Sequence, residues 1–350
     1  MNEIYYIPKT SDKNFEKLLS KLNFDIIEPN SFVALKTHFG EEGNTTFIKP
    51  QIYKPLVKIL LEKKCLPFFT DTNTIYTGKR SNAITHIKLA EKHGFKIDLF
   101  DIPVIIADGI KGNNYVEVEI NLKHFKKAKV ASDIYYSDFL ICLSHFKGHM
   151  LFGFAGAIKN LGMGCAARPG KYLLHNVLKP KFEIKRCIGC WRCIKYCPTG
   201  ALKIDTINNT VVFNVEECAG CAECIHICER KVFSIPWDLS YKDVQERTVE
   251  YAYAVLKNKT KKVFFINFLS NITKDCDCIN KTQKPAIEDI GIVAGDDPVA
   301  VDFASFEIVK NYYGKDLFKE FWGNIDYTPQ IEYAQEIGLG TKDYKLFEVN

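Results

Sequence analysis

Eight of the thirteen cysteines fall into two runs that share the spacing C-x2-C-x2-C-x3-C. The second run follows the first at a constant offset of 31 residues, so the unit is duplicated. This spacing is typical of proteins that bind iron–sulfur clusters, and it predicts two 4Fe-4S clusters as cofactors. The runs are Cys187, Cys190, Cys193 and Cys197, then Cys218, Cys221, Cys224 and Cys228.

The spacing also predicts which cysteines bind together. Three thiolates of one run hold one cluster, and the fourth cysteine of that run binds the other cluster. Zinc is the rival interpretation, since paired C-x2-C units also form zinc sites. Four sulfurs complete a zinc site, so half of these cysteines would be surplus. The predicted crossed sets are Cys187, Cys190, Cys193 and Cys228 for one cluster, and Cys218, Cys221, Cys224 and Cys197 for the other.

Three further cysteines form a less specific pattern. Cys276 and Cys278 present two soft ligands from one C-x-C turn, and Cys165 ends a glycine-rich segment. We predict that the three thiols converge on one site for an additional metal or cluster, which His145 or His149 could complete. The alternative is that they are free, reduced thiols.

Chemically active side chains also follow the predicted strands, at the points where those strands end. In parallel sheets the ligand-binding crevice lies at the carboxyl ends of the strands, so we predict that these side chains line one pocket. Histidine suits proton transfer near neutral pH, and lysine pairs with anions. For any one residue, the alternative is a helix cap or a solvated loop. The candidates for catalysis are His38, His145, His149, Lys147 and Lys159.

The elements that must position these residues alternate between strand and helix. Such alternation predicts an α/β fold with a mostly parallel, doubly wound sheet. A stretch of alternating polarity at 115–122 predicts a half-exposed strand or hairpin arm. Apolar patterns predict strands at 31–38, 66–70, 96–100, 138–144, 263–269 and 291–294, and helices near 12–22, 50–64, 80–93, 240–257 and 298–312.

The cysteine-rich segment interrupts this alternation. We predict that residues 181–236 form an inserted α+β ferredoxin-like domain, and that residues 1–180 and 237–350 form one discontinuous α/β host domain. The alternative is two separate α/β domains that flank a ferredoxin. The part after the segment contains only about two predicted strands, which is too little sheet to stand alone.

Composition narrows the class of protein. The chain has 350 residues, of which 47% are hydrophobic and 25% charged, as in an ordinary globular protein. It begins without a signal-like segment and contains no apolar stretch of membrane-spanning length, so we expect a cytoplasmic protein with no membrane partner. The net charge is +5, but the arginines are few and scattered, so we expect no nucleic-acid partner.

Several segments resemble a known family. SHFKGH at 144–149, GFAGAIKNLGMGCAARPGK at 153–171, the CDC at 276–278 and DIGIVAGDDPVAVD at 289–302 are similar to the uncharacterised iron–sulfur-centre proteins of domain of unknown function family 362. The segment 181–236 resembles a bacterial two-cluster ferredoxin. The resemblance implies an α/β host with a ferredoxin module, and it supplies no substrate.

Two functions fit these patterns. The first is an oxidoreductase that takes electrons from a redox partner protein and passes them through the clusters into the host pocket. There they would reach an unknown small-molecule substrate or a third metal centre. The second is a non-catalytic electron carrier or cluster-handling protein. An electron carrier without catalytic activity does not need so many polar residues at the ends of its strands. The presence of a polar pocket would therefore favour the oxidoreductase over the carrier.

Overall fold

Eight strands form one central sheet in the order β16-β1-β15-β14-β7-β2-β3-β4. The computed structural model describes residues 2–76, 78–175, 180–197, 199–218, 223–234 and 240–349. Strand β15 is antiparallel to β1 and β14, and the other neighbouring pairs are parallel, which confirms a mostly parallel α/β sheet. The strands are β1 (Asn2–Pro8), β2 (Phe32–Lys36), β3 (Leu66–Asp71), β4 (Val104–Ile106), β7 (Phe139–His145), β14 (Val263–Leu269), β15 (Gly291–Gly295) and β16 (Tyr344–Glu348).

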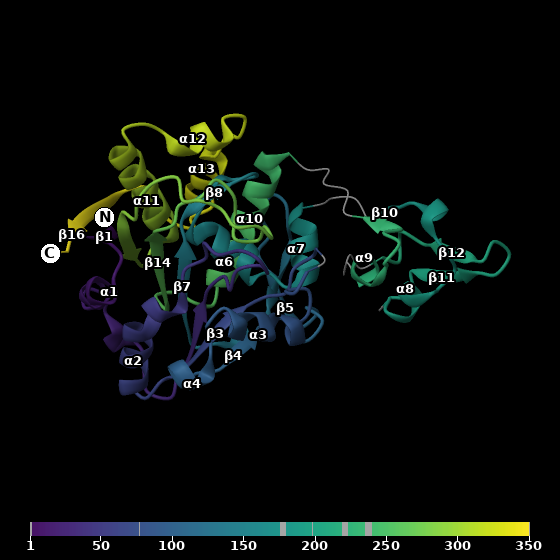
Figure 1. Cartoon of the computed structure of the whole chain (residues 1–350), viewed down its shortest axis with the longest axis horizontal. Coiled ribbons are helices and arrows are strands. Elements are labelled where there is room, and N and C mark those ends of the chain that lie inside the picture. The colour runs from purple at the N-terminus through teal and green to yellow at the C-terminus, as the bar shows by residue number, and fades with distance from the viewer. Residues whose placement is uncertain are drawn as a thin grey trace.

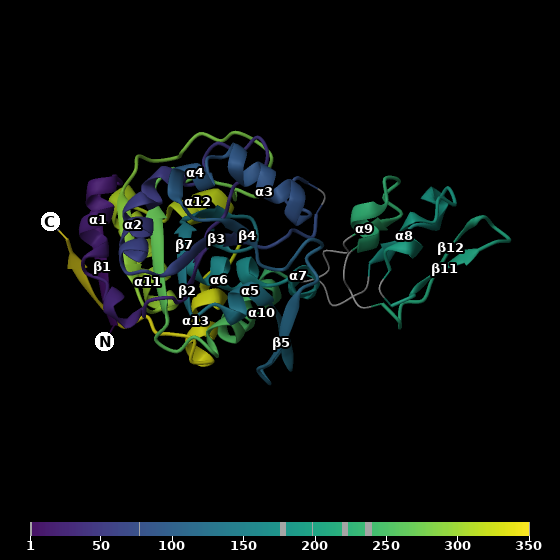
Figure 2. The same ribbon diagram turned by 90° about the horizontal axis from the view of Figure 1, so that it is seen from below.

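Helices cover both faces of the sheet (Figures 1 and 2). All residues of β7 and β14 are therefore buried, and both strands are apolar along almost their whole length. Alternate residues of β7 face different cores: Leu140 and Cys142 join one core, and Ile141 and Leu143 join the other. The first core includes α6 (Ala157–Cys165), α10 (Tyr241–Leu256) and α11 (Pro298–Tyr313), and the second includes α1 (Asp12–Leu19), α2 (Lys54–Glu62) and α3 (Ala83–Lys92).

Shorter elements complete the large unit. The segment that alternates in polarity forms a hairpin, as predicted, because its strand pairs with the strand that follows it. A second hairpin, between β7 and α6, carries two of the candidate catalytic residues. These elements are β5 (Tyr115–Glu119), β6 (Lys127–Ala131), α5 (Ser132–Tyr136), β8 (Lys147–His149), β9 (Gly153–Ala155), α7 (Arg168–His175), α12 (Leu317–Trp322) and α13 (Thr328–Glu336).

Three helices begin where their sequence signals predict. The side chain of Ser11 accepts a hydrogen bond from a backbone N–H in the first turn of α1, and Ser240 does the same for α10. Asp297 caps α11, with Pro298 in its first turn. In all three helices, a side-chain oxygen directly before the first helical residue caps the first turn.

Helix α6 is held from two sides. A Cβ on Gly162 would lie 2.1 Å from the carbonyl oxygen of Thr248, so glycine permits α6 to pack closely against α10. The carboxylate of Asp302, on α11, accepts hydrogen bonds from the backbone N–H groups of Ala157 (2.6 Å) and Ile158 (2.9 Å). These contacts satisfy exposed donors at the start of α6 and fix the helix against the sheet.

Two parts of the sequence prediction are wrong. The strand predicted at 96–100 is the short helix α4 (Ile97–Phe100), and the strand that extends the sheet there is β4, slightly later in the chain. A short apolar run does not by itself distinguish helix from strand. The helix predicted at 50–64 begins as a 3-10 turn (Pro50–Tyr53) before α2. The edge strand β16 was not predicted, because its residues are largely exposed and carry little apolar pattern.

The cysteine-rich segment forms a smaller unit beside the large one (Figures 1 and 2). Its first and last strands pair with each other, with Lys181 opposite Ser234, so the ends of the segment are adjacent. It has a small core of its own around Leu202, Val211 and Phe233. The elements are β10 (Lys181–Phe182), a 3-10 turn (Ile184–Arg186), α8 (Arg192–Lys195), β11 (Leu202–Asp205), β12 (Thr210–Phe213), α9 (Glu223–Ile227) and β13 (Phe233–Ser234).

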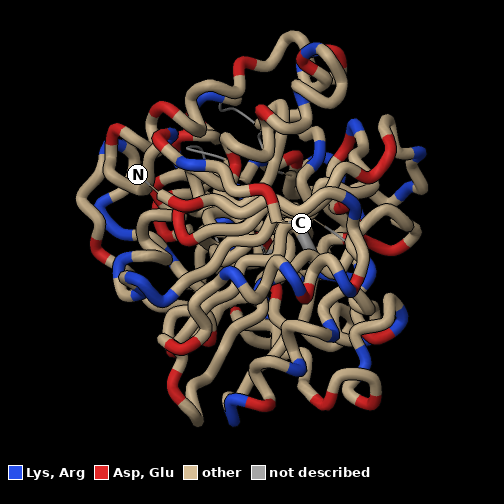
Figure 3. The backbone as a smooth tube through the Cα atoms, turned by 90° about the vertical axis from the view of Figure 1, so that its left-hand side faces the viewer, with Lys and Arg blue, Asp and Glu red and all other residues tan. Residues whose placement is uncertain are grey.

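The surface of the large unit carries charges of both signs. On the side where both termini lie, lysines and arginines are intermixed with aspartates and glutamates (Figure 3). Within the described residues, no helix combines the length and the apolar character needed to cross a membrane.

The pairing of β10 with β13 generates a first prediction. If residues 181–236 are replaced by a short linker, the remaining chain should still fold, because both ends of the segment are adjacent and the sheet takes strands from both sides of it. Circular dichroism should retain the α/β signal, and thermal unfolding should remain cooperative. A chain that loses its cooperative transition would mean that the two parts of the host fold only together with the cysteine-rich unit.

Candidate functional site

A cavity of about 390 Å³ lies at the carboxyl ends of the parallel strands. The last residues of β2, β3 and β7 line it, as does the loop that follows β14. This is the place where ligands bind in open α/β sheets. The cavity brings together all of the candidate catalytic residues, which are His38, His145, Lys147, His149 and Lys159.

A buried ion network closes the floor of this cavity. The carboxylate of Asp71 lies 3.0 Å from Lys36 Nζ and 3.0 Å from a guanidinium nitrogen of Arg80, and all three side chains are almost fully buried. Arg80 also lies 3.3 Å from Glu41. Burial raises the pKa of Asp71, but Lys36 and Arg80 outweigh that effect and hold the pKa well below its ordinary value. Asp71 is therefore a fixed negative charge.

A second buried carboxylate orders the wall of the cavity. Asp277 lies 2.8 Å from His145 Nδ1 and 3.6 Å from Lys147 Nζ. Burial raises the pKa of Asp277, but His145 and Lys147 more than compensate and lower it below its ordinary value. The other ring nitrogen of His145 lies 3.1 Å from the carbonyl oxygen of Asn271. Both ring nitrogens of His145 are therefore engaged, and the residue also lines the cavity.

His38 and His149 have a common arrangement. The Nδ1 atom of each ring accepts a hydrogen bond from the backbone N–H two residues later, at 3.0 Å from Gly40 and at 3.1 Å from Leu151. Burial lowers the pKa of His149 to about 4, and burial together with Arg80 lowers that of His38 well below its ordinary value. Both rings are therefore neutral at physiological pH, with the proton on Nε2.

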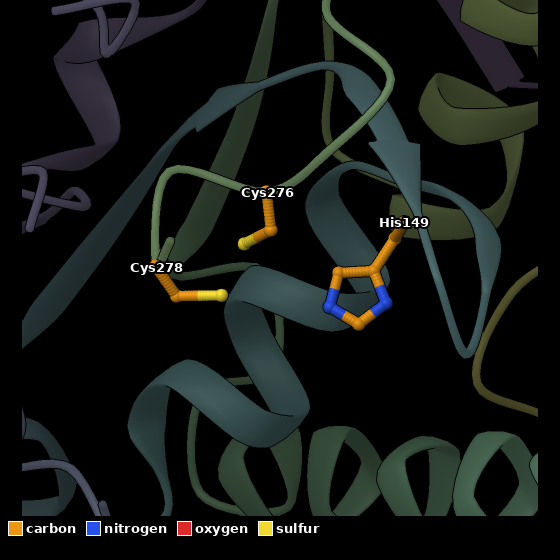
Figure 4. Close-up of side chains that lie close together, drawn as sticks. All are labelled: His149, Cys276 and Cys278. Atoms are coloured by element: carbon orange, nitrogen blue, oxygen red, sulfur yellow. The ribbon is translucent and has the colours of Figure 1, made fainter. Parts of the chain in front are cut away.

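The C-x-C turn lies against His149. Ligand atoms of His149, Cys276 and Cys278 lie within 4.8 Å of one another, and one ring nitrogen points toward the sulfurs (Figure 4). Lys159 Nζ lies 4.0 Å from the sulfur of Cys276. The pKa of Cys276 lies well below its ordinary value because Cys278 donates a hydrogen bond to it, and Lys159 adds to this effect against the opposing effect of burial. The pKa of Cys278 is correspondingly raised.

The structure does not bring Cys165 to this group. Cys165 is buried in the core with Cys142 and Leu161, and its thiol contacts the carbonyl oxygen of Asn160 at 3.7 Å. On α6, the residues that line the cavity are Lys159, Asn160, Met163 and Gly164. Cys165 falls on the opposite, core-facing side of the helix together with Leu161. The predicted trio is thus replaced by His149, Cys276 and Cys278.

The cysteine-rich unit contains a second cavity, of about 100 Å³. Four thiols from both runs line it, namely Cys187, Cys190, Cys193 and Cys228. The backbone N–H of Val232 lies 3.4 Å from the sulfur of Cys228. Burial raises the pKa of Cys193 to about 11, and the neighbouring Cys228 and Cys187 add to this. His149, Cys276 and Cys278 lie close enough to form a candidate metal-binding group. The four thiols that line the smaller cavity are soft donors of the kind that hold a metal or a cluster.

The other predicted ligand set is described in part. Cys197 and Cys224 pack against the same small apolar core as the first set. Cys218 is half-buried, and Cys221 lies outside the described residues.

The two units meet beside the large cavity. Ile225, the residue after Cys224, packs against Ile75 and Tyr172 of the large unit. Ile75 and its neighbour Tyr76 also line the large cavity. The helix that carries Cys224 therefore contacts the wall of the pocket.

Sequence reasoning missed several residues that line the pocket. Tyr76 belongs to no recognised catalytic motif. Its hydroxyl oxygen accepts a hydrogen bond from Arg80 at 2.6 Å. Lys171 is buried, and it donates hydrogen bonds to Thr72 and Asn73. Burial lowers the pKa of Lys171 to about 8. Tyr76 lies in the loop after the strand predicted at 66–70, and Lys171 ends the segment 153–171, but neither residue was singled out as a candidate.

The ion network generates a second prediction. The Asp71→Asn variant should lose about 3–5 kcal/mol of unfolding free energy, because buried Lys36 loses its carboxylate and Arg80 keeps only Glu41. The matched control is Asp25→Asn, which removes an exposed 2.8 Å pair with Lys63 and should leave stability nearly unchanged. Urea unfolding measures both. The depressed pKa of Asp71 implies that its contribution is present above a pH of about 4 and is lost as the pH falls further. Equal stability of the two variants would contradict this account.

Comparison with known proteins agrees with the sequence motifs. No curated protein matches the chain. The lactate racemase apoprotein from Thermoanaerobacterium thermosaccharolyticum is 14% identical, with a TM-score of 0.37, and the match covers 75% of this chain and 50% of that one. A structural-genomics protein from Thermotoga maritima is 13% identical, with a TM-score of 0.42, over 95% of this chain and 61% of that one. The chain thus spans half to about three-fifths of the length of these structures. Residues 33–307 match the model of the domain of unknown function DUF362, and the chain therefore belongs to this family.

Proposed function

We propose that this protein is an iron–sulfur oxidoreductase. The eight cysteines of the two runs would hold two 4Fe-4S clusters, which supply single electrons when bound. The observation that carries the proposal is the smaller cavity, because thiols from both runs line it together. They are Cys187, Cys190, Cys193 and Cys228, the set that crossed ligation requires.

The surroundings of these thiols fit such a cofactor. The cavity is enclosed by apolar side chains that include Val211, Val232 and Phe233. The donor set is purely thiolate, which suits iron–sulfur clusters. A backbone N–H directed at the sulfur of Cys228 is the kind of hydrogen bond that tunes cluster potentials.

In this proposal the two units have different roles. Residues 181–236 would be an inserted ferredoxin-like domain that exchanges electrons with a redox partner protein. Residues 1–180 and 237–350 would be the host domain that binds the substrate. Two observations support this division: strands from both host segments share one sheet, and the ends of the insert are paired.

Within the host pocket, the roles follow from which charges are already paired. Lys36 pairs with Asp71 and Lys147 pairs with Asp277, whereas Lys159 contacts no carboxylate within the described part of the chain. We assign Lys159 to an anionic group of a small-molecule substrate. The neutral rings of His38 and His149 would supply protons through Nε2, and His145 with Lys147 would hold the C-x-C loop. A non-catalytic electron carrier needs no such pocket, which favours the enzyme.

Cofactor content is the first test of this function. Protein prepared without oxygen should contain about eight iron and eight acid-labile sulfide per chain, from two clusters. Its broad visible absorbance should bleach with dithionite. Colourless protein that contains zinc in place of iron would overturn the proposal.

Double variants test the crossed ligand sets. In Cys228→Ser combined with Cys190→Ser, both changes affect one cluster, so about four iron should remain. In Cys228→Ser combined with Cys224→Ser, the changes affect different clusters, and both should be lost. Iron and sulfide assays with electron paramagnetic resonance measure the outcome, and Cys65→Ser, in the host core, is the control. The reverse pattern would show that each run holds its own cluster.

A further inference from the structure

We propose that Cys276 and Cys278 form a redox-active dithiol–disulfide pair in the host pocket. This inference rests on the proposed function, because it names the group in the pocket that stores the electrons entering through the cysteine-rich unit. The pair would exchange two electrons with a small disulfide.

The C-x-C turn is held in a fixed conformation. The backbone N–H of Glu41 donates to the carbonyl oxygen of Asp277 at 2.9 Å, and the N–H of Ile279 donates to that of Cys276 at 3.1 Å. The carboxylate between the two cysteines is fixed by His145. Both cysteines line the large cavity, so a substrate that enters the cavity reaches them.

The orientation of His149 favours a thiolate over a metal at this site. A histidine that binds a metal through Nε2 normally donates a hydrogen bond from Nδ1. Here Nδ1 of His149 faces a donor, the N–H of Leu151, so the neutral ring carries its proton on Nε2. That nitrogen can donate to the sulfur of Cys276, and it has no lone pair left for a cation. Two thiols alone would be an incomplete ligand set for zinc.

The charged groups around the C-x-C turn distinguish the sulfur of Cys276 from that of Cys278. Cys276 is surrounded by Lys159 from α6, by Lys147 and His149 from β8, and by His38 from the loop after β2. Lys159 Nζ lies 4.0 Å from the sulfur of Cys276, and the ligand atoms of His149, Cys276 and Cys278 lie within 4.8 Å of one another, so this arrangement can stabilise a thiolate at Cys276. A stabilised thiolate is the attacking group in thiol–disulfide exchange.

The chemistry balances with this assignment. When the disulfide is reduced, two one-electron equivalents from an iron–sulfur donor and one proton enter: the S–S bond breaks, Cys276 becomes a thiolate and Cys278 takes the proton. In the other direction, the Cys276 thiolate attacks one sulfur of the small disulfide and releases one thiolate. The sulfur of Cys278 then attacks Cys276, loses its proton to the second leaving sulfur and closes the protein disulfide.

The contact between the units lies on the side of the pocket that leads to this pair. Ile225, next to Cys224, packs against Ile75 and Tyr172, and Tyr76 belongs to the same contact. The hydroxyl of Tyr76 lies beside Arg80, and the charge of Cys278 contributes to raising its pKa. The helix that carries Cys224 thus contacts the pocket wall through Ile225, and Tyr76 in the same contact lies near Cys278.

Thiol labelling tests the proposal on the full-length protein. The protein is equilibrated without oxygen in buffers of reduced and oxidised dithiothreitol, quenched with N-ethylmaleimide and digested with trypsin. The peptide 275–281 contains Cys276 and Cys278 and no other cysteine. We expect it to change reversibly from two labels to none, with the slope of a two-electron couple, while Cys165→Ala behaves like the wild type. If the peptide carries two labels at every ratio of reduced to oxidised dithiothreitol, the proposal is wrong.

A second measurement separates the pair from a structural or metal role. In Lys159→Gln, labelling of Cys276 at pH 7 should slow roughly tenfold, because its thiolate is less stable. The equilibrium between the dithiol and the disulfide should also shift about tenfold toward the disulfide. This shift corresponds to about 30 mV for a two-electron couple. Lys310→Gln, an exposed change, is the control. Protection of both thiols by one equivalent of Zn²⁺ that depends on His149 would overturn the proposal in favour of a metal site. The dithiothreitol titration does not require bound clusters, so its result can be interpreted even if the protein contains no iron.

Discussion

The pocket depends on the buried carboxylate of Asp71. It lies at the end of β3 and holds Lys36, at the end of β2, and Arg80, ahead of α3. Lys36 also donates to Asn160 of α6 at 2.7 Å, and Asn160 in turn donates to the end of β7. A buried cation without such a partner would be strongly destabilising, so the charges fix the strands and the helix in one arrangement. The cavity is the space that this network leaves open.

The arrangement places most of the charge of the pocket out of reach of a ligand. Asp71 and Glu41 together neutralise Lys36 and Arg80. Asp277 pairs with Lys147 beside His145. Lys171 is held by hydrogen bonds to Thr72 and Asn73. The groups left for a ligand include Lys159, the neutral rings of His38 and His149, and the C-x-C turn. These groups would serve the proposed reduction of a small anionic molecule. The contact at Ile225 connects the pocket to the cysteine-rich unit.

Much of the fold could be predicted from the sequence, because its signals are local. The buried strand β7 is a continuous apolar run, and serine or aspartate caps precede α1, α10 and α11. The segment 96–100 was predicted wrongly because a run of five residues does not separate helix from strand. Strand β16 pairs at the sheet edge with its side chains largely exposed, so no apolar pattern marks it.

The site could be predicted only to the level of which residues gather. The placement of polar residues after strands identified His38, His145 and His149 correctly as neighbours of one cavity. It did not tell that Cys165 faces the core, since that depends on the rotation of α6 about its axis. Nor could it tell which nitrogen of His149 carries the proton, since that depends on a backbone N–H two residues away.

The central claim is that the cysteine-rich unit and the pocket are one electron path. It is tested most directly by timing the reduction of the Cys276–Cys278 disulfide after full-length protein is mixed, without oxygen, with a low-potential one-electron donor. Labelled peptide 275–281 reports the thiols formed. The account predicts rapid appearance of both thiols in the wild type and a delay of roughly a hundredfold or more when residues 181–236 are replaced by a short linker. Equal rates in the two proteins would contradict it.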